Sequence, residues 1–409
     1  MRNQMKLTAN RRGPRHNFLI NEASLFFLLL LSVYSCKKHE DPLPVTYGIA
    51  QFIYTSDLHY GESRTFRGAM VEACMVNEAL VQQINKLPAM TYPADGGVSE
   101  GTMVGAFDYI IIGGDITSRQ EVGPPQIQPA TVSWGQFAAG YLNGITLTNR
   151  NNQKAGFLLE CGNHDVSNDI GYPKPIDPPT DAAAMVNIYN LMMNPPVPLT
   201  NSTYNYSTDK INYSKNLAGV HLMFVNMWPD SAERIWMEKD LANITVTTPV
   251  IIFTHDQPDC EAKHFTNPNG SHDINSTDKF ENLVDERFKD GTTTDAESTI
   301  EQRNMVAFLK THQNIKAYFH GNDNWNEFYI FKGPDNDINL YVYRVDSPIK
   351  GTISGIEAPD GIGDETKLSF QTIVIDGDSK TLTVRECLWN TSGITSPLIW
   401  GTSSTISLN

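Results

Sequence analysis

The sequence predicts an α/β protein in which short buried strands alternate with helices. Six apolar runs of five to eight residues, each followed by polar residues, have the length of such strands. They are Ile49–Ser56, Ala106–Gly113, Gly156–Cys161, Val220–Asn226, Val250–Thr254 and Ile315–His320. Hydrophobic residues make up 40% of the 409, enough for a large packed core, so the composition excludes a disordered chain.

Two segments between these runs have apolar residues at helical spacing. Phe66–Leu87 presents Met70, Leu80 and Ile84 among others, and predicts a helix after the first strand. Ser231–Ala242 begins with a serine that can cap a helix, and predicts a second one.

The C-terminal part changes character. Leu340–Val345 and Leu368–Leu388 are rich in β-forming residues, and Ile375–Ser379 has the composition of a hairpin turn. By contrast, Asp256–Thr299 is long and polar with few periodic apolar residues, which is typical of a functional loop or lid.

The first 35 residues have the pattern of an export signal. A basic head precedes the apolar run Leu25–Val33, which is too short to span a bilayer as a helix. The run leads to Ser35-Cys36 and two lysines, which resembles the lipobox of bacterial lipoproteins. We therefore expect a signal peptide over 1–35, a lipid on Cys36 and a tether over 36–47; the alternative is an ordinary secretory signal with an incidental cysteine.

The charge of the chain bears on its partners. The net charge is −15, and removal of 1–35 leaves −19. So acidic a protein is a poor ligand for long nucleic acids, whose binding needs Lys and Arg, and only a lipid would hold it at an anionic membrane. We expect export and lipid anchoring to a bacterial membrane, periplasmic or at the cell surface. The sequence does not identify a protein partner.

Metal-binding residue types follow five of the predicted strands. Sites in layered α/β proteins gather at the carboxyl ends of strands, so these separated segments are expected to converge. The segments are Asp57-Leu-His59, Gly113-Gly-Asp115, Gly162-Asn-His-Asp165, His255-Asp256 and His320-Gly-Asn-Asp-Asn324. Each alone is a weak signal, but their order and positions together predict a metal site.

These blocks resemble the calcineurin-like metallophosphoesterase superfamily, whose ordered motifs are D-x-H, G-D, G-N-H-[DE], H and G-H-x-H. The resemblance covers roughly residues 48–348, and four of the five motifs match letter for letter. It implies a four-layer α/β/β/α sandwich of two mixed sheets flanked by helices. The domain is expected over 48–350 with a polar insertion at 256–299, and the β-rich segment 351–409 is expected to complete the second sheet.

The resemblance also implies a centre of two divalent metal ions. Asp57 and His59 would hold the first ion, Asn163 and His255 the second, and Asp115 would bridge them. Two cations about 3.5–4 Å apart can clamp a phosphoryl group and lower the pKa of a water between them. The expected ions are Mn, Mg or Fe/Zn.

Three further residues near these motifs have candidate roles: His164 and Asp165 in the third motif, and Arg119 four residues after Asp115. His164 would protonate the leaving group, and Asp165 would orient its ring. Arg119 could bind a phosphate oxygen. The alternatives are a structural histidine and a surface arginine.

The last motif departs from the family, because Gly321-Asn-Asp-Asn324 stands where G-H-x-H is usual. Position by position, Asn322 replaces a ligand of the second ion and Asn324 one of the first. Amide oxygens are harder and weaker donors than imidazole, which favours Mn or Mg over Zn. His320 could substitute in part if the strand continued, since alternate residues share a face.

Other polar and aromatic residues are less informative. His264 and His272 in the polar insertion could close over a substrate, or could simply be solvated. Tyr60, Trp228 and Trp325 could form a wall for the leaving group, although core packing explains them equally well. We assign no role to His221 or His312.

The sequence thus predicts an enzyme: a metal-dependent phosphoesterase that hydrolyses a phosphomonoester or phosphodiester of a small substrate through a metal-activated water. The alternative is a lipoprotein that retains the fold and binds phosphate with one metal or without catalysis. A glycan-binding lipoprotein is a third and weaker interpretation.

Overall fold

The computed structural model describes residues 48–118, 128–167, 182–205, 208–259, 299–349, 364–392 and 397–409. The predicted signal peptide, Cys36 and the tether lie outside these residues, as do Arg119, His264 and His272 and most of the polar insertion. Within the described ranges, no helix has the length and apolar character that crossing a bilayer requires.

The first sheet combines both ends of the described chain. Its strand order is β14-β13-β12-β1-β4-β5. Here β1, β4 and β5 are parallel and the other pairs are antiparallel. The bounds are Ile49–Thr55 (β1), Tyr109–Ile112 (β4), Gly156–Leu159 (β5), Ser369–Asp376 (β12), Thr381–Leu388 (β13) and Ile399–Ser407 (β14).

We expected the C-terminal strands to complete the second sheet, and this prediction is wrong. They extend the first sheet, because β1 pairs with β4 on one side only and offers its other edge to β12, from Ile49 opposite Asp376 to Tyr54 opposite Gln371. The predicted hairpin turn does connect β12 to β13, with Ile375 opposite Leu382.

The second sheet has the order β10-β11-β9-β8-β7-β6. Its four middle strands are parallel, and β10 and β6 pair antiparallel at its edges. The bounds are Tyr213–Leu217 (β6), Val220–Phe224 (β7), Val250–Phe253 (β8), Ile315–His320 (β9), Glu327–Phe331 (β10) and Leu340–Arg344 (β11). All six strands predicted in the first part of the sequence are present, each within a few residues of the expected ends.

The helices differ more from expectation. The helix predicted over Phe66–Leu87 is shorter, because a hairpin of β2 (Ser63–Phe66) and β3 (Ala69–Glu72) occupies its first part and α1 begins at Ala73. The second predicted helix, α5, spans Ser231–Leu241, but its N-cap is Asp230, whose carboxylate accepts a hydrogen bond from Glu233 N at 2.9 Å. The helix bounds are Ala73–Ile84 (α1), Ala130–Phe137 (α2), Asn163–Ser167 (α3), Ala183–Met193 (α4), Ser231–Leu241 (α5) and Thr299–Thr311 (α6).

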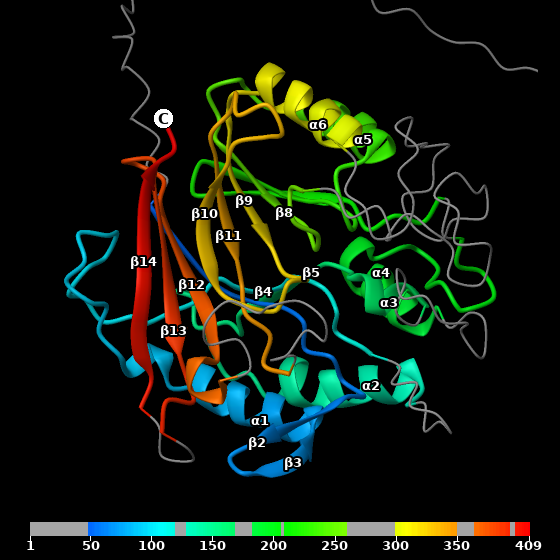
Figure 1. Cartoon of the computed structure of the whole chain (residues 1–409), viewed down its shortest axis with the longest axis vertical. Coiled ribbons are helices and arrows are strands. Elements are labelled where there is room, and N and C mark those ends of the chain that lie inside the picture. The colour runs from blue at the N-terminus through cyan, green and yellow to red at the C-terminus, as the bar shows by residue number, and fades with distance from the viewer. Residues whose placement is uncertain are drawn as a thin grey trace, which may run out of the picture. The chain divides into compact units, whose positions relative to one another are not determined.

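Alternation along the strands produces the layers. Tyr54 of β1 lies between the sheets, with its ring centroid 5.8 Å from that of Phe253 of β8. The preceding Ile53 faces the other way and packs in the cluster that includes α1, while Ile252 packs in the cluster that includes α5 and α6. Figure 1 shows α1 and α2 beside the first sheet, and α5 next to α6 beside the second. The four-layer α/β/β/α arrangement is confirmed.

Candidate metal centre

The predicted ligands converge because they follow parallel strands. Asp57 and His59 follow β1, Asp115 follows β4 and Asn163 follows β5, all in the first sheet. From the second sheet come His255 after β8 and the 321–324 loop after β9. Asp57, His59, Asp115 and His255 are at most 1% exposed, so their polar atoms face one another inside the protein.

Asp115 lies at the middle of the group. Its Oδ2 is 3.6 Å from His59 Nε2, and its Oδ1 is 3.4 Å from His255 Nε2. Burial opposes ionisation of Asp115, but His255, His164 and His59 together hold the pKa of this carboxyl well below its usual range. The two oxygens of one carboxylate therefore face two different histidines, which is the arrangement expected of a bridging ligand.

Asp57 and His59 lie on one side of Asp115. Ligand atoms of the three side chains all lie within 4.8 Å of one another, and His59 Nε2 is 3.7 Å from Asp57 Oδ1. Asp57 Oδ2 also accepts a hydrogen bond from the backbone N–H of Asn322 at 3.0 Å. The last motif is thus fastened to the first one.

His255 and Asn163 lie on the other side. His255 Nδ1 is 2.7 Å from the carbonyl oxygen of Gly113, which can only accept, so Nδ1 carries a proton. Nε2 then faces Asn163 Oδ1 at 3.2 Å. Burial disfavours the charged ring, but Asp115, Asp57 and Asp256 raise its pKa well above the usual value. A ring held through Nδ1–H by a carbonyl is the usual support for a histidine that binds a metal through Nε2.

The backbone at the centre adopts a conformation that non-glycine residues rarely take. The φ angles are positive at Asp57 (56°), His59 (41°), Asp115 (49°), Asn322 (65°) and Asn324 (66°). Each such residue costs about 1–3 kcal/mol, and such strain collects at functional sites where the surrounding structure enforces it. Five of the seven predicted ligands share this feature.

Two motif glycines are required by close packing against ligand atoms. A Cβ at Gly162 would overlap Asp115 Oδ1, and a Cβ at Gly321 would overlap the Ser56 hydroxyl and Asp57 Oδ2. Any side chain at either position would displace a carboxylate of the centre.

In the last motif, the backbone of Asn322 contacts the carboxylate of Asp57, whereas the His320 ring contacts Gly321 and Tyr329. The Asn322 side-chain N–H donates to Gln257 Oε1 at 3.0 Å, and the Asn324 N–H donates to the carbonyl of Asn322 at 2.7 Å. His320 ends β9, and its ring contacts Gly321 O through Nδ1 and the Tyr329 hydroxyl through Nε2. Since both ring nitrogens are engaged, His320 is not a substitute ligand.

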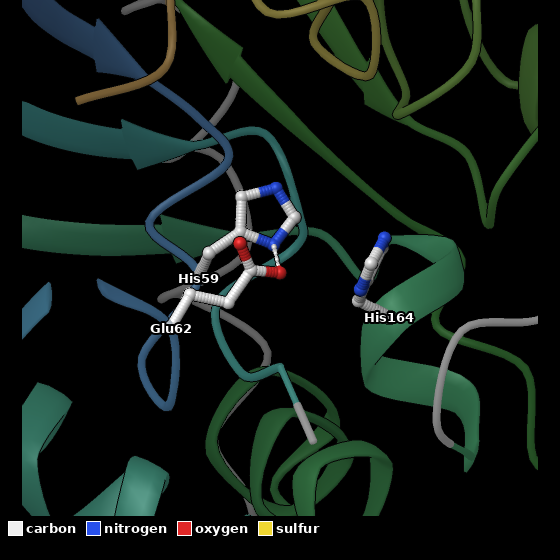
Figure 2. A group of neighbouring side chains, drawn as sticks. All are labelled: His59, Glu62 and His164. Atoms are coloured by element: carbon white, nitrogen blue, oxygen red, sulfur yellow. Dashed lines mark ion pairs between the residues drawn. The ribbon is translucent and has the colours of Figure 1, made fainter. Parts of the chain in front are cut away.

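His164 lies next to the ligands, with its Nε2 3.8 Å from Asp115 Oδ2. Figure 2 shows its ring across from His59, with Glu62 beside His59. The two rings meet edge to face with centroids 4.6 Å apart. His164 Nδ1 is 3.0 Å from the Ser118 hydroxyl.

Asp165 has a different task from the one we predicted. It accepts hydrogen bonds from the backbone N–H groups of Ile116, Thr117 and Gly162 at 2.8–3.1 Å, and so ties the loops after β4 and β5 together. Burial and the charge of Asp115 raise its pKa to about 6. The prediction that Asp165 orients the His164 ring is wrong, because Ser118 is the side chain at Nδ1.

Sequence reasoning missed Glu62, Ser118 and Gln257. Glu62 and Ser118 each follow a predicted ligand by three residues, and Gln257 follows His255 by two. Proximity to the motifs was the available signal, but it does not say which neighbours turn inward.

The remaining aromatic candidates pack as structural residues. Tyr60 and Trp228 are at most 1% exposed and belong to the cores on the helix sides of the two sheets. Trp325 covers the Arg344 guanidinium, 3.7 Å from its ring centroid. His221 contacts Asp240 and His312 contacts Glu238, away from the centre.

The donor set suits a divalent cation. Asn324 Oδ1 is buried and accepts no hydrogen bond from the described residues, so an acceptor is left for a positive group. Buried carboxylates, amide oxygens and imidazoles together are ligands for Mn, Mg, Fe or Zn ions. The residues present therefore fit a metal.

Comparison with known proteins adds structural likenesses at low identity. No family model and no curated protein matches the chain. Among solved structures it is similar to a dimetal phosphatase from Danio rerio, with 9% identity, a TM-score of 0.48, and coverage of 88% of this chain and 100% of that one. It is also similar to the calcineurin-like phosphoesterase YfkN from Bacillus subtilis, with 11% identity, a TM-score of 0.32, and coverage of 88% and 91%.

The chain resembles the calcineurin-like metallophosphoesterases in its fold and its motifs. The shared features are the two mixed sheets and the motif residues that meet at their strand ends. The chemistry of the centre follows from its own residues.

Proposed function

We propose that the chain is a metal-dependent phosphoesterase with a dinuclear centre. The observation that carries this proposal is the position of Asp115, whose Oδ2 faces His59 and whose Oδ1 faces His255. Asp57, His59, Asp115 and Asn324 would hold one ion, and Asp115, Asn163, His255 and Asn322 the other. Two bound divalent cations would clamp a phosphoryl group and activate a water between them.

The residues of the chain supply the proton for the departing group. His164 Nε2 faces the ligands, whereas Nδ1 is held by Ser118. An imidazolium at this position gives its Nε2 proton to the oxygen that leaves phosphorus, so the products are a neutral alcohol and phosphate or a phosphomonoester. Arg119, the predicted phosphate contact, lies outside the described residues.

A single-metal or non-catalytic phosphate-binding protein is the second candidate. It is favoured by the last motif, where the Asn322 amide already donates to Gln257 and no imidazole is available. The second ion would then depend on Asp115, Asn163 and His255.

The test is hydrolysis of a chromogenic phosphomonoester and phosphodiester by the metal-free protein with added Mn, Mg, Ca or Zn. Because five of the seven predicted ligands offer hard oxygens, we expect activity with Mn or Mg to exceed that with Zn. No turnover with any metal, together with less than one bound ion per chain, would favour the binding protein.

The proposal includes export and a lipid on Cys36. Its support is the basic head, the short apolar run and the Ser35-Cys36 pair. In a bacterial host the full chain is expected in the membrane fraction with incorporated palmitate. The Cys36→Ser variant is expected to incorporate no palmitate, and to be either released from the membrane or left with an uncleaved signal peptide. Equal palmitate labelling of both forms would overturn the lipid assignment.

A further inference from the structure

The loops that follow β1 and β4 are joined along their backbones. His59 N donates to Asp115 O at 2.9 Å, Tyr60 N donates to Ile116 O at 3.0 Å, and Ser118 N donates to Tyr60 O at 2.8 Å. These bonds fix the position of Ser118 relative to the turn that carries Glu62.

Gly61 makes this approach feasible. Its φ is +116°, and a Cβ there would overlap the carbonyl oxygen of Ser118. Only glycine combines this backbone conformation with so close a passage. The chain after His59 therefore turns directly against Ser118 and brings Glu62 beside it.

A chain of hydrogen bonds runs from Glu62 to His164. The Ser118 hydroxyl donates to Glu62 Oε1 at 2.8 Å. The hydroxyl oxygen of Ser118 also lies 3.0 Å from His164 Nδ1. Ser118 is 1% exposed and His164 is 7% exposed, so water competes little for these bonds.

The number of protons sets the direction of each bond. A carboxylate only accepts, so the single hydroxyl proton of Ser118 goes to Glu62. The serine oxygen must then accept a proton from His164 Nδ1. This assigns the neutral His164 ring to the Nδ1–H tautomer and leaves Nε2, on the side of Asp115, as the nitrogen that exchanges a proton.

We propose that Glu62 and Ser118 are positioning residues that hold His164 in the Nδ1–H tautomer with Nε2 directed at the leaving group. The inference rests on the proposed function, and assigns a role to two residues that no motif contains. After His164 gives up its Nε2 proton, the Nδ1 proton stays in its bond to Ser118, so the ring keeps its orientation through turnover.

A different task for Glu62 is also open to measurement. Ligand atoms of His59, Glu62 and His164 lie within 4.8 Å of one another, and His59 Nδ1 is 3.8 Å from Glu62 Oε1. If this trio held a metal, loss of the Glu62 carboxylate would remove an ion. If Glu62 acts through Ser118, the metal content stays constant.

The experiment compares two esters that differ only in the leaving group, a nitrophenyl ester and a simple alkyl ester. Nitrophenolate leaves without a proton, whereas an alkoxide needs one. With the metal-loaded protein, Ser118→Ala and Glu62→Gln are expected to lower kcat for the alkyl ester about 10- to 100-fold and for the nitrophenyl ester only a few-fold. KM and metal content are expected to stay unchanged, and Ser118→Thr to restore most of the alkyl-ester rate.

Two comparisons make the result specific. The matched control is Ser214→Ala, because Ser214 donates to Asp240, which contacts His221, in a similar network outside the centre. It is expected to leave both rates unchanged. Ser118→Ala added to His164→Ala is expected to cause no further loss of kcat, since Ser118 acts only through the His164 ring that is already absent.

Equal losses with both esters, additive losses in the double variant, or loss of an ion in Glu62→Gln would each overturn the inference. Should the wild-type protein hydrolyse neither ester, the proposed function fails, but the tautomer is still measured. Long-range ¹H–¹⁵N NMR of the Mg²⁺-loaded protein, with the His164 signals identified from His164→Ala, is expected to show Nδ1–H, and Ser118→Ala to shift the tautomer balance. An Nε2–H ring in the wild type would contradict the assignment.

Discussion

Three imidazole rings surround the carboxylate of Asp115, and each presents its Nε2 to it. His59 and His164 face Oδ2 at 3.6 and 3.8 Å, and His255 faces Oδ1 at 3.4 Å. Their other ring nitrogens separate their tasks. His255 is held by a backbone carbonyl, which suits a metal ligand, while His164 is held by a serine hydroxyl, which suits a ring that transfers protons.

At the residue scale, we predict that His164→Ala keeps its metal ions and loses turnover. His164 is not one of the predicted ligands on either side of Asp115, so its removal leaves the ligand set intact. The variant does lack the proton donor for an alkoxide leaving group. The loss of kcat is expected to be about 10²- to 10⁴-fold, measured alongside elemental analysis of the same sample. A variant that loses its ions would show that His164 is a ligand.

The sequence predicted the residue types at the centre because the motif positions and the strand ends coincide. It did not predict Glu62 or Ser118, since their bond depends on Gly61 allowing one loop to pass against another. It also gave Asp165 the wrong contact, because a carboxylate beside a histidine in sequence has backbone N–H groups nearer to it in space.

At the scale of elements, the ends of parallel strands assemble the centre, and glycines let the connecting loops meet. Gly321 follows β9, and its backbone passes against Ser56 and Asp57 at the end of β1. The two sheets are thus in contact through the residues that would hold the first ion.

We predict that Gly321→Ala weakens metal binding about 10- to 100-fold, because the added methyl group displaces the Asp57 carboxylate. The folded state is also expected to lose about 1–3 kcal/mol from overpacking. Gly135→Ala is the control: Gly135 lies in α2 with open space around it, so the change is expected to be neutral or slightly stabilising. Metal titration and thermal unfolding of both variants check this, and unchanged affinity in Gly321→Ala would contradict it.

The hairpin before α1 shows why one element was predicted wrongly. Arg67 and Gly68 both have positive φ, at 53° and 81°, as a type I′ hairpin turn requires. Apolar spacing through Met70 indicated a helix, yet Met70 is 70% exposed. A local turn preference prevailed over the spacing, and the helix begins only at Ala73.

At the scale of the whole molecule, an ion pair between a buried arginine and a half-buried aspartate ties the segment before β4 to the C-terminal strands. The Arg385 guanidinium of β13 donates to both oxygens of Asp95 at 2.7 and 2.8 Å, and Arg385 is 1% exposed. Chiefly through this hydrogen bonding, the pKa of Asp95 is held at about 2, below its unfolded value near 3.9.

Because the folded pKa is depressed, this pair stabilises the protein above about pH 4, and the stabilisation is lost as the pH falls toward 2. Asp95→Asn is expected to cost about 1–2 kcal/mol near neutral pH and clearly less near pH 3, as measured by urea unfolding. Asp335→Asn is the control, since Asp335 makes the same two-oxygen contact with Arg303 in solvent. A penalty for Asp95→Asn that does not change with pH would contradict this account.

The fold class followed from the sequence because alternating burial along the strands leaves few ways to cover both faces of two sheets. The sequence did not show which sheet the last three strands join, because any exposed sheet edge can accept a strand. The pairing of β12 with β1 determines that they join the first sheet.

The central claim is that separated strand ends form one centre for two ions, and elemental analysis tests it most directly. After loading with Mn²⁺ or Mg²⁺ and removal of free metal, the wild-type protein is expected to retain close to two ions per chain. Asp115→Asn, which weakens the shared ligand, is expected to retain fewer than one. A wild-type protein without bound ions, or a variant that keeps both, would contradict the claim.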